Sequence, residues 1–370
     1  MTCIARVHYF LDPPSLKSRL RMKRLLGLLV LGIVSVIGFG NDTEAQSVQH
    51  TPDWPDWAYG LLSPLTPDDT VSPPCPPAAM PIECAYIGTP VPDDGVKRSL
   101  PDTALTFTRN EAYFGYGPAD WYPGDHPTMP DVVARGREAD GLRACALCHY
   151  PNGQGKMENG HVSGLPAAYI LQQLEAFENG TRRSADPRKA NTNEMAMIAT
   201  RLTEEEKNQV AEYYSSMAYR PMVQVIEAEE APHVRVTSNG LMLPVPGMPP
   251  VPLGQRIIEI PDDPERTEMT RDPRGGFIAY VPVGSLARGE QLVTTGGQGK
   301  TIQCGLCHGP DQMGLGITPG IGGRTASYIM RQLWDIKQGT RQSPLMSAVV
   351  ANLTADDMLE ISAYIASLAE

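Results

Sequence analysis

The chain has 370 residues, with 35 glycines and 35 prolines, so we expect two or three units joined by much irregular structure. Its formal net charge is −11 at pH 7, and an acidic surface disfavours nucleic acid as a partner because phosphates repel it. Aromatic residues make up only 6% of the chain, which is typical of small cores.

Residues 1–45 have the pattern of a secretory signal peptide. Basic residues precede a short apolar stretch at Leu25–Phe39, and the small residues Thr43 and Ala45 offer a cleavage site before Gln46. A membrane-spanning helix needs about 20 apolar residues, so an uncleaved anchor is the weaker alternative. We therefore expect export and no stable membrane span after cleavage.

Residues 46–130 form a Pro-rich N-terminal extension without a helical period. We expect irregular structure draped over the domain that follows. Trp54, Trp57 and Trp121 suit a docking surface for a partner protein, and covering of the first domain is the alternative. In an exported chain Cys75 and Cys84 favour a disulfide, which would stabilise by roughly 2–3 kcal/mol through closure of a short loop. Two free thiols are the weaker alternative.

The pattern Cys-x-x-Cys-His occurs twice, at Cys145–His149 and at Cys304–His308. It is typical of covalent attachment of haem c, because one helical turn places both thiols beneath the vinyl groups and the adjacent imidazole reaches the iron. We predict thioether bonds and axial histidines from six residues: Cys145, Cys148, His149, Cys304, Cys307 and His308. Structural zinc is disfavoured because it needs four donors and each motif supplies three.

The two motifs belong to an internal repeat. The shift of 159 residues that superposes them also superposes Ala167–Leu174 on Ala326–Leu333 and Gly180–Arg182 on Gly339–Arg341. Further on the shift becomes 151, pairing Leu202 with Leu353, so eight residues are extra in the first copy. The repeat predicts two haem domains, residues 131–220 and residues 285–370, with residues 221–284 as a linker.

Three helices are predicted in each copy. The first covers Val132–Asp140 or Ser285–Val293, with Gly136 or Gly289 admitting a crossing helix, and the second covers Ala167–Asn179 or Thr325–Gln338. The third begins after Thr203 or Thr354 as the cap and carries an apolar stripe that faces the core. In the linker, Val234–Val236 and Gln255–Ile260 predict some extended structure among many prolines.

The repeat resembles the tandem class I cytochromes c of the bacterial periplasm, especially the dihaem cytochrome c4 type. The matching residues are Tyr169-Ile170-x-x-Gln173-Leu174 and Tyr328-Ile329-x-x-Gln332-Leu333, within 131–220 and 285–370. The resemblance implies an all-α fold of two tandem class I cytochrome c domains. The Pro-rich N-terminal segment and the linker lie outside that plan, so we expect the packing of the two domains to depart from it.

The resemblance also implies a methionine as the sixth ligand of each iron, on a loop before the last helix. Met195 and Met346 both stand seven residues before the leucine that opens that helix, which favours them. Met197 is the rival in the first copy. His161 has Gly320 as its repeat counterpart and is therefore interpreted as a surface histidine, while His126 and His233 have no counterpart.

In this family a proline carbonyl orients the proximal histidine, as an outer-shell partner does. Pro319 fits that place in the second copy, but Gly160 stands there in the first. We therefore expect the two haems to differ in reduction potential.

The resemblance implies a soluble periplasmic electron carrier with two covalent haem c groups rather than an enzyme. Its partners would be redox proteins: a donor dehydrogenase or quinol-oxidising complex, and an acceptor oxidase or another cytochrome. The alternatives are a cytochrome subunit docked on a dehydrogenase, or a dihaem enzyme such as a peroxidase or a thiosulfate-oxidising protein.

Overall fold

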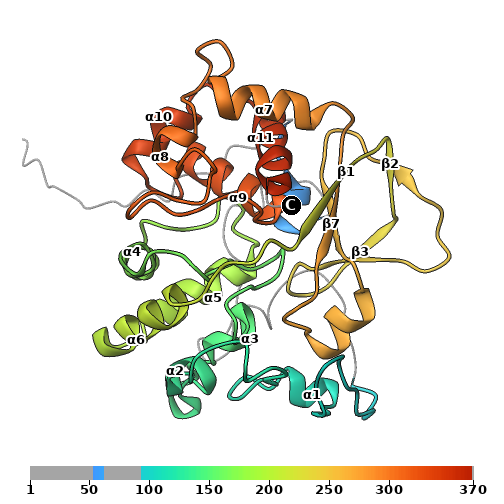
Figure 1. The fold of residues 1–370 in the computed structure, drawn as a ribbon, viewed down its shortest axis with the longest axis vertical. Coiled ribbons are helices and arrows are strands. Elements are labelled where there is room, and N and C mark those ends of the chain that lie inside the picture. Colours follow the sequence, from blue (N-terminus) through green and yellow to red (C-terminus); the bar gives the residue numbers. More distant parts are fainter. Residues whose placement is uncertain (1–52, 62–92, 369–370) are drawn as a thin grey trace, which may run out of the picture. The chain divides into compact units, whose positions relative to one another are not determined.

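The computed structural model describes residues 53–61 and 93–368 (Figure 1). The predicted signal peptide, Cys75 and Cys84 lie outside these residues. No helix within the described ranges is both long enough and apolar enough to cross a membrane.

The first copy of the repeat has a core between its middle and last helices. Its elements are α2 (Asp131–Ala134), the 3-10 turn η4 (Glu138–Asp140), α3 (Cys145–His149), α4 (Ala167–Glu178), α5 (Ala190–Ala199) and α6 (Glu204–Ser215). Leu174 of α4 and Val210 of α6 belong to one buried cluster. The predicted cap of the last helix is confirmed, since Thr203 Oγ1 accepts from the Glu206 N–H and the Glu206 carboxylate accepts from the Thr203 N–H.

The helix predicted over Val132–Asp140 is wrong, because the chain turns at Gly136. This residue has φ +64°, and a Cβ there would lie 2.1 Å from the Leu142 carbonyl oxygen. Only glycine tolerates both the left-handed backbone and that close approach. The glycine therefore closes a turn before the motif instead of admitting a crossing helix.

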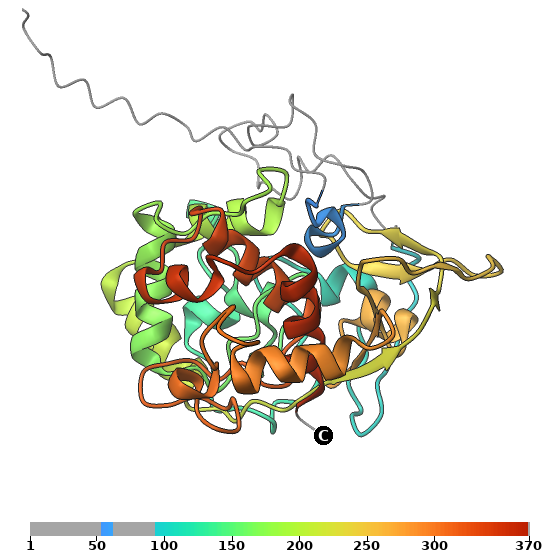
Figure 2. The same cartoon turned by 90° about the horizontal axis from the view of Figure 1, so that it is seen from above.

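The second copy has the crossing that the first lacks. Its helices are α7 (Ser285–Thr295), α8 (Gly305–His308), α9 (Ala326–Lys337), α10 (Pro344–Val350) and α11 (Ala355–Ser367). A Cβ on Gly289 of α7 would lie 2.1 Å from the Glu360 carbonyl oxygen of α11, so the two helices cross in contact at this glycine. Figure 2 shows α7 as the orange helix in front of the red helices of this copy.

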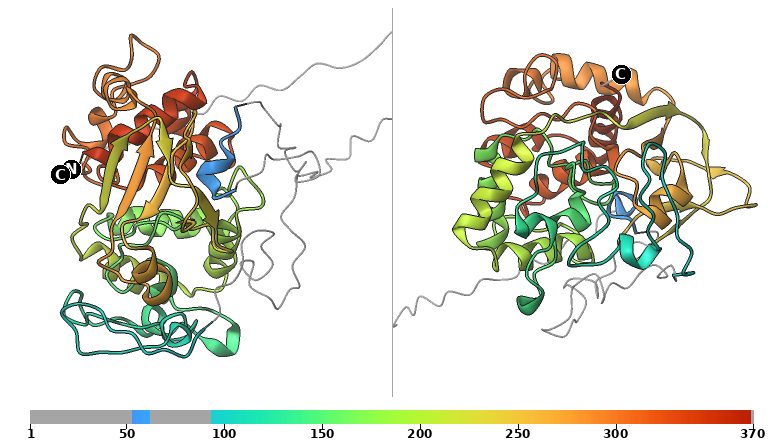
Figure 3. Two further views of the ribbon diagram at one scale, coloured as in Figure 1. Left: turned by 90° about the vertical axis from the view of Figure 1, so that its right-hand side faces the viewer. Right: turned by 60° about the horizontal axis from the view of Figure 1, so that its bottom comes forward.

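The expectation of an all-α fold is corrected by the linker, which contains strands. They are β1 (Val223–Glu227), β2 (Glu230–Ala231), β3 (Val234–Val236), β4 (Met242–Pro244), β5 (Val251–Pro252), β6 (Ile258–Pro261) and β7 (Phe277–Val281). The largest sheet has the order β1-β7-β6, in which β7 is parallel to β1 and antiparallel to β6 (Figure 3). The two β-branched runs expected to be extended contribute β3 and β6.

The sheet is part of a core that it shares with the last helix. Leu359, Ala363 and Ala366 of α11 belong to the same buried cluster as Phe277 and Ala279 of β7. The opposite side of α11 enters the core of the second copy through Met358, Ile361 and Ile365. Since α11 is buried on two sides, the linker is structurally an extension of the second copy.

The described part of the N-terminal extension contacts the first copy, over which it was expected to lie, and the second copy as well. The turn η1 (Asp56–Tyr59) packs on α9, where Trp54 meets Trp334 edge to face at 5.7 Å between ring centroids. Further along, α1 (Arg109–Ala112) precedes Gly115, whose carbonyl oxygen accepts from the Ala144 N–H at 2.9 Å beside the first motif.

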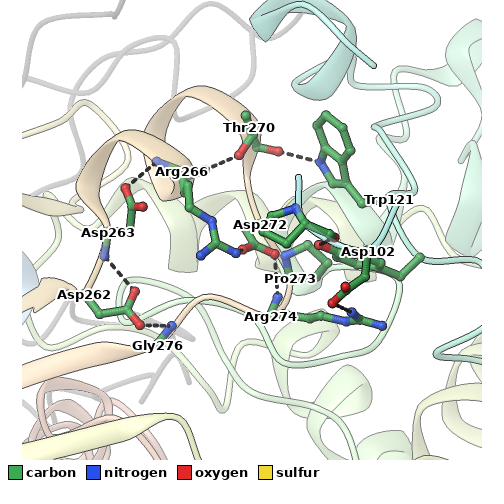
Figure 4. Close-up of polar contacts among 12 residues, drawn as sticks. Asp102, Trp121, Asp262, Asp263, Arg266, Thr270, Asp272, Pro273, Arg274 and Gly276 are labelled. Atoms are coloured by element: carbon green, nitrogen blue, oxygen red, sulfur yellow. Dashed lines mark hydrogen bonds and ion pairs between the residues drawn. The ribbon is translucent and has the colours of Figure 1, made fainter. Parts of the chain in front are cut away.

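Trp121 anchors the same extension to the linker. Its indole Nε1 donates to the Thr270 carbonyl oxygen at 2.7 Å (Figure 4). Its ring also meets that of Phe107 edge to face. Thr270 closes a single π-helical turn, Arg266–Thr270, whose start is fixed by the Asp263 carboxylate accepting from the Arg266 N–H at 2.9 Å. Extension and linker thus meet next to the first motif.

Candidate haem sites

The first Cys-x-x-Cys-His motif forms the short helix α3, which opens onto a cavity. Cys145, Cys148 and His149 line this cavity together with Met195. Met195 lies on helix α5 and Met346 on helix α10, so the expected loop position of both methionines is corrected. The structure thus brings together the four residues predicted to hold the first haem, and Met197 is not among the lining residues.

The second motif has a related arrangement in the other copy. Cys304 and Met346 are half-buried and pack against the same apolar cluster, while His308 is buried and Cys307 is exposed. Cys304 is the N-cap of α8, on which Cys307 lies. Met346 lies on α10, the helix before the last one, as Met195 lies on α5 in the first copy. None of the four motif cysteines forms a disulfide, so all of them keep a thiol for attachment.

Both histidines are oriented by a backbone carbonyl. His149 Nδ1 lies 2.7 Å from the Gly160 oxygen, and His308 Nδ1 lies 2.8 Å from the Pro319 oxygen. The carbonyl oxygen of Gly160 therefore has for His149 the role that the carbonyl oxygen of Pro319 was predicted to have for His308. Burial lowers the pKa of both imidazoles, which favours the neutral ring that can bind a metal through Nε2.

The chain leaves each motif through a left-handed residue directly after the histidine. In the second copy this is Gly309, at φ +84°, whereas in the first it is Tyr150, at φ +65°. A tyrosine is strained in this region and needs its surroundings to hold it. Arg271 does so by lying over the buried ring, 4.9 Å from its centroid.

The residues present fit a covalent haem at each motif. Two thiols on one helical turn and an oriented neutral imidazole occur in both copies, and in the first copy a thioether faces the same cavity. That cavity is bordered on one side by residues of the other copy, Tyr328, Arg331 and Asp335 of α9. The first site therefore adjoins the contact between the copies.

This contact consists of the residues that the repeat pairs with one another. Arg182 donates to Gln173 at 2.8 Å in its own copy and to Gln332 at 3.0 Å across the contact. Arg341 mirrors it, donating to Gln332 at 2.8 Å and to Gln173 at 3.1 Å. Arg182 and Arg341 also pair through their backbones as an isolated antiparallel bridge. The packing of the copies is thus symmetric in spite of the added segments.

The tyrosines of the repeated motif complete this contact. Arg341 donates to the Tyr169 hydroxyl at 2.7 Å, and Arg182 lies 3.4 Å from the Tyr328 hydroxyl. Burial alone would raise the pKa of Tyr328, but Arg182 and Arg341 lower it below the ordinary value. The sequence showed these residues as repeated without showing that they face each other.

His161 is not a surface histidine, because it is buried at the same contact. Its Nδ1 hydrogen-bonds to the Gln154 carbonyl oxygen, its Nε2 lies 2.9 Å from the Thr325 hydroxyl, and its ring meets Tyr328 edge to face. Burial, and then the charge of Arg324, lowers its pKa to about 3. A neutral His161 therefore joins the loop after the first motif to the start of α9.

The two motifs differ in what covers them. Arg271 of the linker donates to the carbonyl oxygens of Ala112, Ala146 and Leu147, which holds the linker and the extension against the first motif. Around the second motif, Leu306, Ile317 and Leu345 are 66%, 74% and 85% exposed. The repeat counterparts of the last two are Glu158 and Glu194, both buried. The second site is therefore the open one.

Comparison with known proteins places this arrangement in one class, the electron-transferring cytochromes c. Residues 133–218 match the cytochrome c family. A curated relative in Stutzerimonas stutzeri, named thiosulfate dehydrogenase electron acceptor, is 32% identical over 245 residues, which cover 65% of this chain and 85% of the relative. Cytochrome c4 of Pseudomonas aeruginosa is 38% identical over 72 residues, which cover 19% of this chain and 36% of that protein.

The chain therefore belongs to the cytochrome c family and is a cytochrome c4-like member of it. Among solved structures, thiosulfate dehydrogenase (TsdBA) from Marichromatium purpuratum in its "as isolated" form is 26% identical, with a TM-score of 0.42. That match covers 64% of this chain and 38% of the other.

Proposed function

We propose that the chain is a dihaem electron carrier with one covalent haem c at each motif. The observation that carries this proposal is the cavity in which Cys145, Cys148, His149 and Met195 converge from two helices. In the second copy Cys304, Cys307, His308 and Met346 take the same roles. A haem with histidine and methionine ligands supplies a one-electron iron couple of raised potential.

The chain's own residues bind, orient and shield these groups. Gly160 and Pro319 hold the histidines through their carbonyl oxygens, and the linker shields the first site through Arg271. The exposed apolar side chains of Leu306, Ile317 and Leu345 support the second site as the one that meets a partner. Electrons thus exchange with other proteins at the second haem and reach the first through the contact between the copies.

We further propose that the protein works in the periplasm and receives its electrons from a dehydrogenase. The predicted signal peptide supports export, and the name of the Stutzerimonas stutzeri relative supports a donor that oxidises reduced sulfur compounds. The acidic net charge of −11 fits a partner with a basic docking surface, whose approach would weaken at high salt.

A haem count with a redox titration tests the proposal. The mature wild-type protein should give two haems per chain in the pyridine haemochrome assay and two transitions in the titration. Converting Cys304→Ala and Cys307→Ala together should halve the covalent haem, as should Cys145→Ala with Cys148→Ala. Full haem staining in either double variant would show that attachment occurs elsewhere.

The same haem-loaded protein can be used to distinguish an electron carrier from an enzyme. In a carrier, methionine fills the sixth coordination position of both irons. The reduced protein should therefore not bind carbon monoxide, and by itself it should turn over neither thiosulfate nor peroxide. Turnover by the isolated protein would contradict the carrier proposal.

A further inference from the structure

The eight residues that are extra in the first copy build a buried charged segment beside its cavity. They lie between Arg182 and Met195, whereas the equivalent segment of the second copy, between Arg341 and Met346, is eight residues shorter. Asp186, Arg188 and Lys189 of this segment are 0%, 6% and 3% exposed. Charged side chains are almost never buried without a partner, so each of the three calls for one.

Two of these charges have partners within the protein. Arg188 donates to Asp186 from Nε at 3.0 Å and from Nη2 at 2.7 Å, and it also lies 3.3 Å from the Asp56 carboxylate. Lys189 differs from its neighbours: its Nζ has no hydrogen-bond partner among residues 53–61 and 93–368. Lys189 nevertheless lines the cavity of the first site.

The surroundings of Lys189 leave room for its ammonium without neutralising it. A Cβ on Gly240 would lie 2.8 Å from Lys189 Nζ, so the glycine provides the space. Arg331, which also lines the cavity, donates to the Ala58 and Met157 carbonyl oxygens and adds positive charge. Burial, and then Arg331, lowers the pKa of Lys189 to about 7, so an anion in the cavity would favour the charged ammonium.

Three nearby carboxylates, those of Glu158, Asp186 and Asp335, favour the charged ammonium of Lys189, but all three are largely used by other groups. Asp186 accepts from Arg188, and Asp335 accepts from the Tyr59 hydroxyl and the Ala185 N–H. Glu158 Oε1 accepts from Lys156 Nζ at 2.6 Å and from Asn239 Nδ2 at 2.9 Å, while its Oε2 has no partner within the described ranges. Because Lys156 already balances its charge, Glu158 is the weaker partner for Lys189. A haem brings two carboxylates of its own into the cavity, and a buried carboxylate requires a cation or several donors.

We propose that the ammonium of Lys189 binds a propionate of the haem attached at Cys145 and Cys148. This inference rests on the proposed covalent haem. A positive charge beside a haem favours the ferrous state, because reduction adds an electron to the site. The inserted segment therefore raises the potential of the first haem relative to a site without Lys189, and the second copy, which lacks the segment, lacks this contribution.

Redox titration of the holoprotein tests the contact. Lys189→Met should lower the midpoint potential of the first haem and leave that of the second unchanged, whereas Lys189→Arg, which keeps the charge, should restore most of it. Lys207→Met is the matched control: this lysine is equally buried but paired with Glu178 and Glu204 on the outer side of the first copy. Unchanged potentials in Lys189→Met, or equal shifts of both haems, would overturn the inference.

A measurement on the wild type keeps the test independent of folding in the variants. In the reduced, diamagnetic holoprotein, nuclear Overhauser effects should connect the Lys189 side chain to propionate methylene protons of the first haem. Contacts from Lys189 to Glu158 alone would overturn the inference. A preparation with fewer than two haems per chain would instead show failure of the proposed function, so the two failures are distinguishable.

Discussion

Other segments of the chain cover different sides of the two copies of the repeat. In the first copy the face with the motif is covered by the linker and the extension, whereas its last helix α6 exposes a charged outer face that begins with Glu204 and Glu205. In the second copy the motif is open, whereas α9 and α11 are covered by η1 and by the sheet. The same helical unit thus provides a shielded site and an accessible one.

The difference arises from the segments outside the repeat together with substitutions between the two copies at equivalent positions. α6 and α11 are equivalent helices of the two copies. The outer face of α6 is charged, whereas the equivalent face of α11 is apolar and is covered by the sheet. Conversely, the buried Glu158 and Glu194 of the first copy stand where the second has exposed Ile317 and Leu345. A tandem cytochrome can therefore differentiate its two sites by what packs around them.

The largest expected effect separates the sites by ligand access. Met346→Ala should lower the potential of the second haem and let the reduced iron bind carbon monoxide, which the wild type refuses. Met195→Ala should open the first iron too, but carbon monoxide should reach it more slowly because Arg271 holds the linker over the motif. Flash photolysis of both variants measures the two rates.

Equal carbon monoxide rates in the two variants would mean that the cover over the first site does not limit access. An unchanged redox titration in Met346→Ala would show that this methionine is not the ligand. Met197→Ala serves as the control, since Met197 lies outside the residues that line the cavity.

A smaller effect tests the cover itself. Arg271 is 2% exposed and donates to the Ala112, Ala146 and Leu147 carbonyl oxygens, so Arg271→Ala leaves buried acceptors without donors. The expected loss is roughly 2–4 kcal/mol in the free energy of unfolding, since each unsatisfied buried group costs about 1–3 kcal/mol. Urea unfolding of the holoprotein measures it.

Arg274 is the matched control for Arg271. It is three residues away on the same loop, but its pairing with Asp125 at 2.7 Å is part-exposed. Arg274→Ala should therefore cost only about 0–1 kcal/mol, as surface ion pairs do. If both variants lose the same free energy of unfolding, the buried contacts of Arg271 do not hold the linker over the first motif.

Local patterns in the sequence predicted the repeated helices well. The middle helices end within one residue of the predicted bounds, and Gly180 and Gly339 follow them at φ +83° and +75°. Capping boxes and the residues that converge on the first cavity were also predictable, because their spacing recurs in both copies. Repetition supplies a check that a single copy does not.

Other features depend on contacts between distant segments and had no such check. The sheet joins β1 to β7, which are over fifty residues apart, and each strand is too short for alternation to stand out. Gly136 and Gly289 looked alike in sequence, but only the second sits at a helix crossing. The insertion was visible as eight extra residues, yet the burial of Lys189 depends on a distant segment, since Gly240 of the linker lies against its Nζ.

The smallest expected effect tests where the two copies are alike. Both last helices begin with a capping box, Thr203 with Glu206 and Thr354 with Asp357. Each of these carboxylates also pairs with a cation that precedes the motif of its own copy, Arg137 in the first and Lys300 in the second. Thr203→Ala and Thr354→Ala should therefore each cost about 1 kcal/mol, as the loss of an N-cap does.

The pH dependence of this cap effect should also be the same in both copies. Burial raises the pKa of Glu206 and Asp357, but the hydrogen bonds from Arg137 and Lys300, together with those from Thr203 and Thr354, outweigh it, so both pKa values are lowered. A lowered pKa means that the stabilisation is present above the unfolded-state pKa and is lost as the pH falls through the folded-state value. Urea midpoints at pH 7 and in acid, with Thr203→Ser and Thr354→Ser as controls, measure this; unequal losses would show that the sheet behind α11 alters its cap as well.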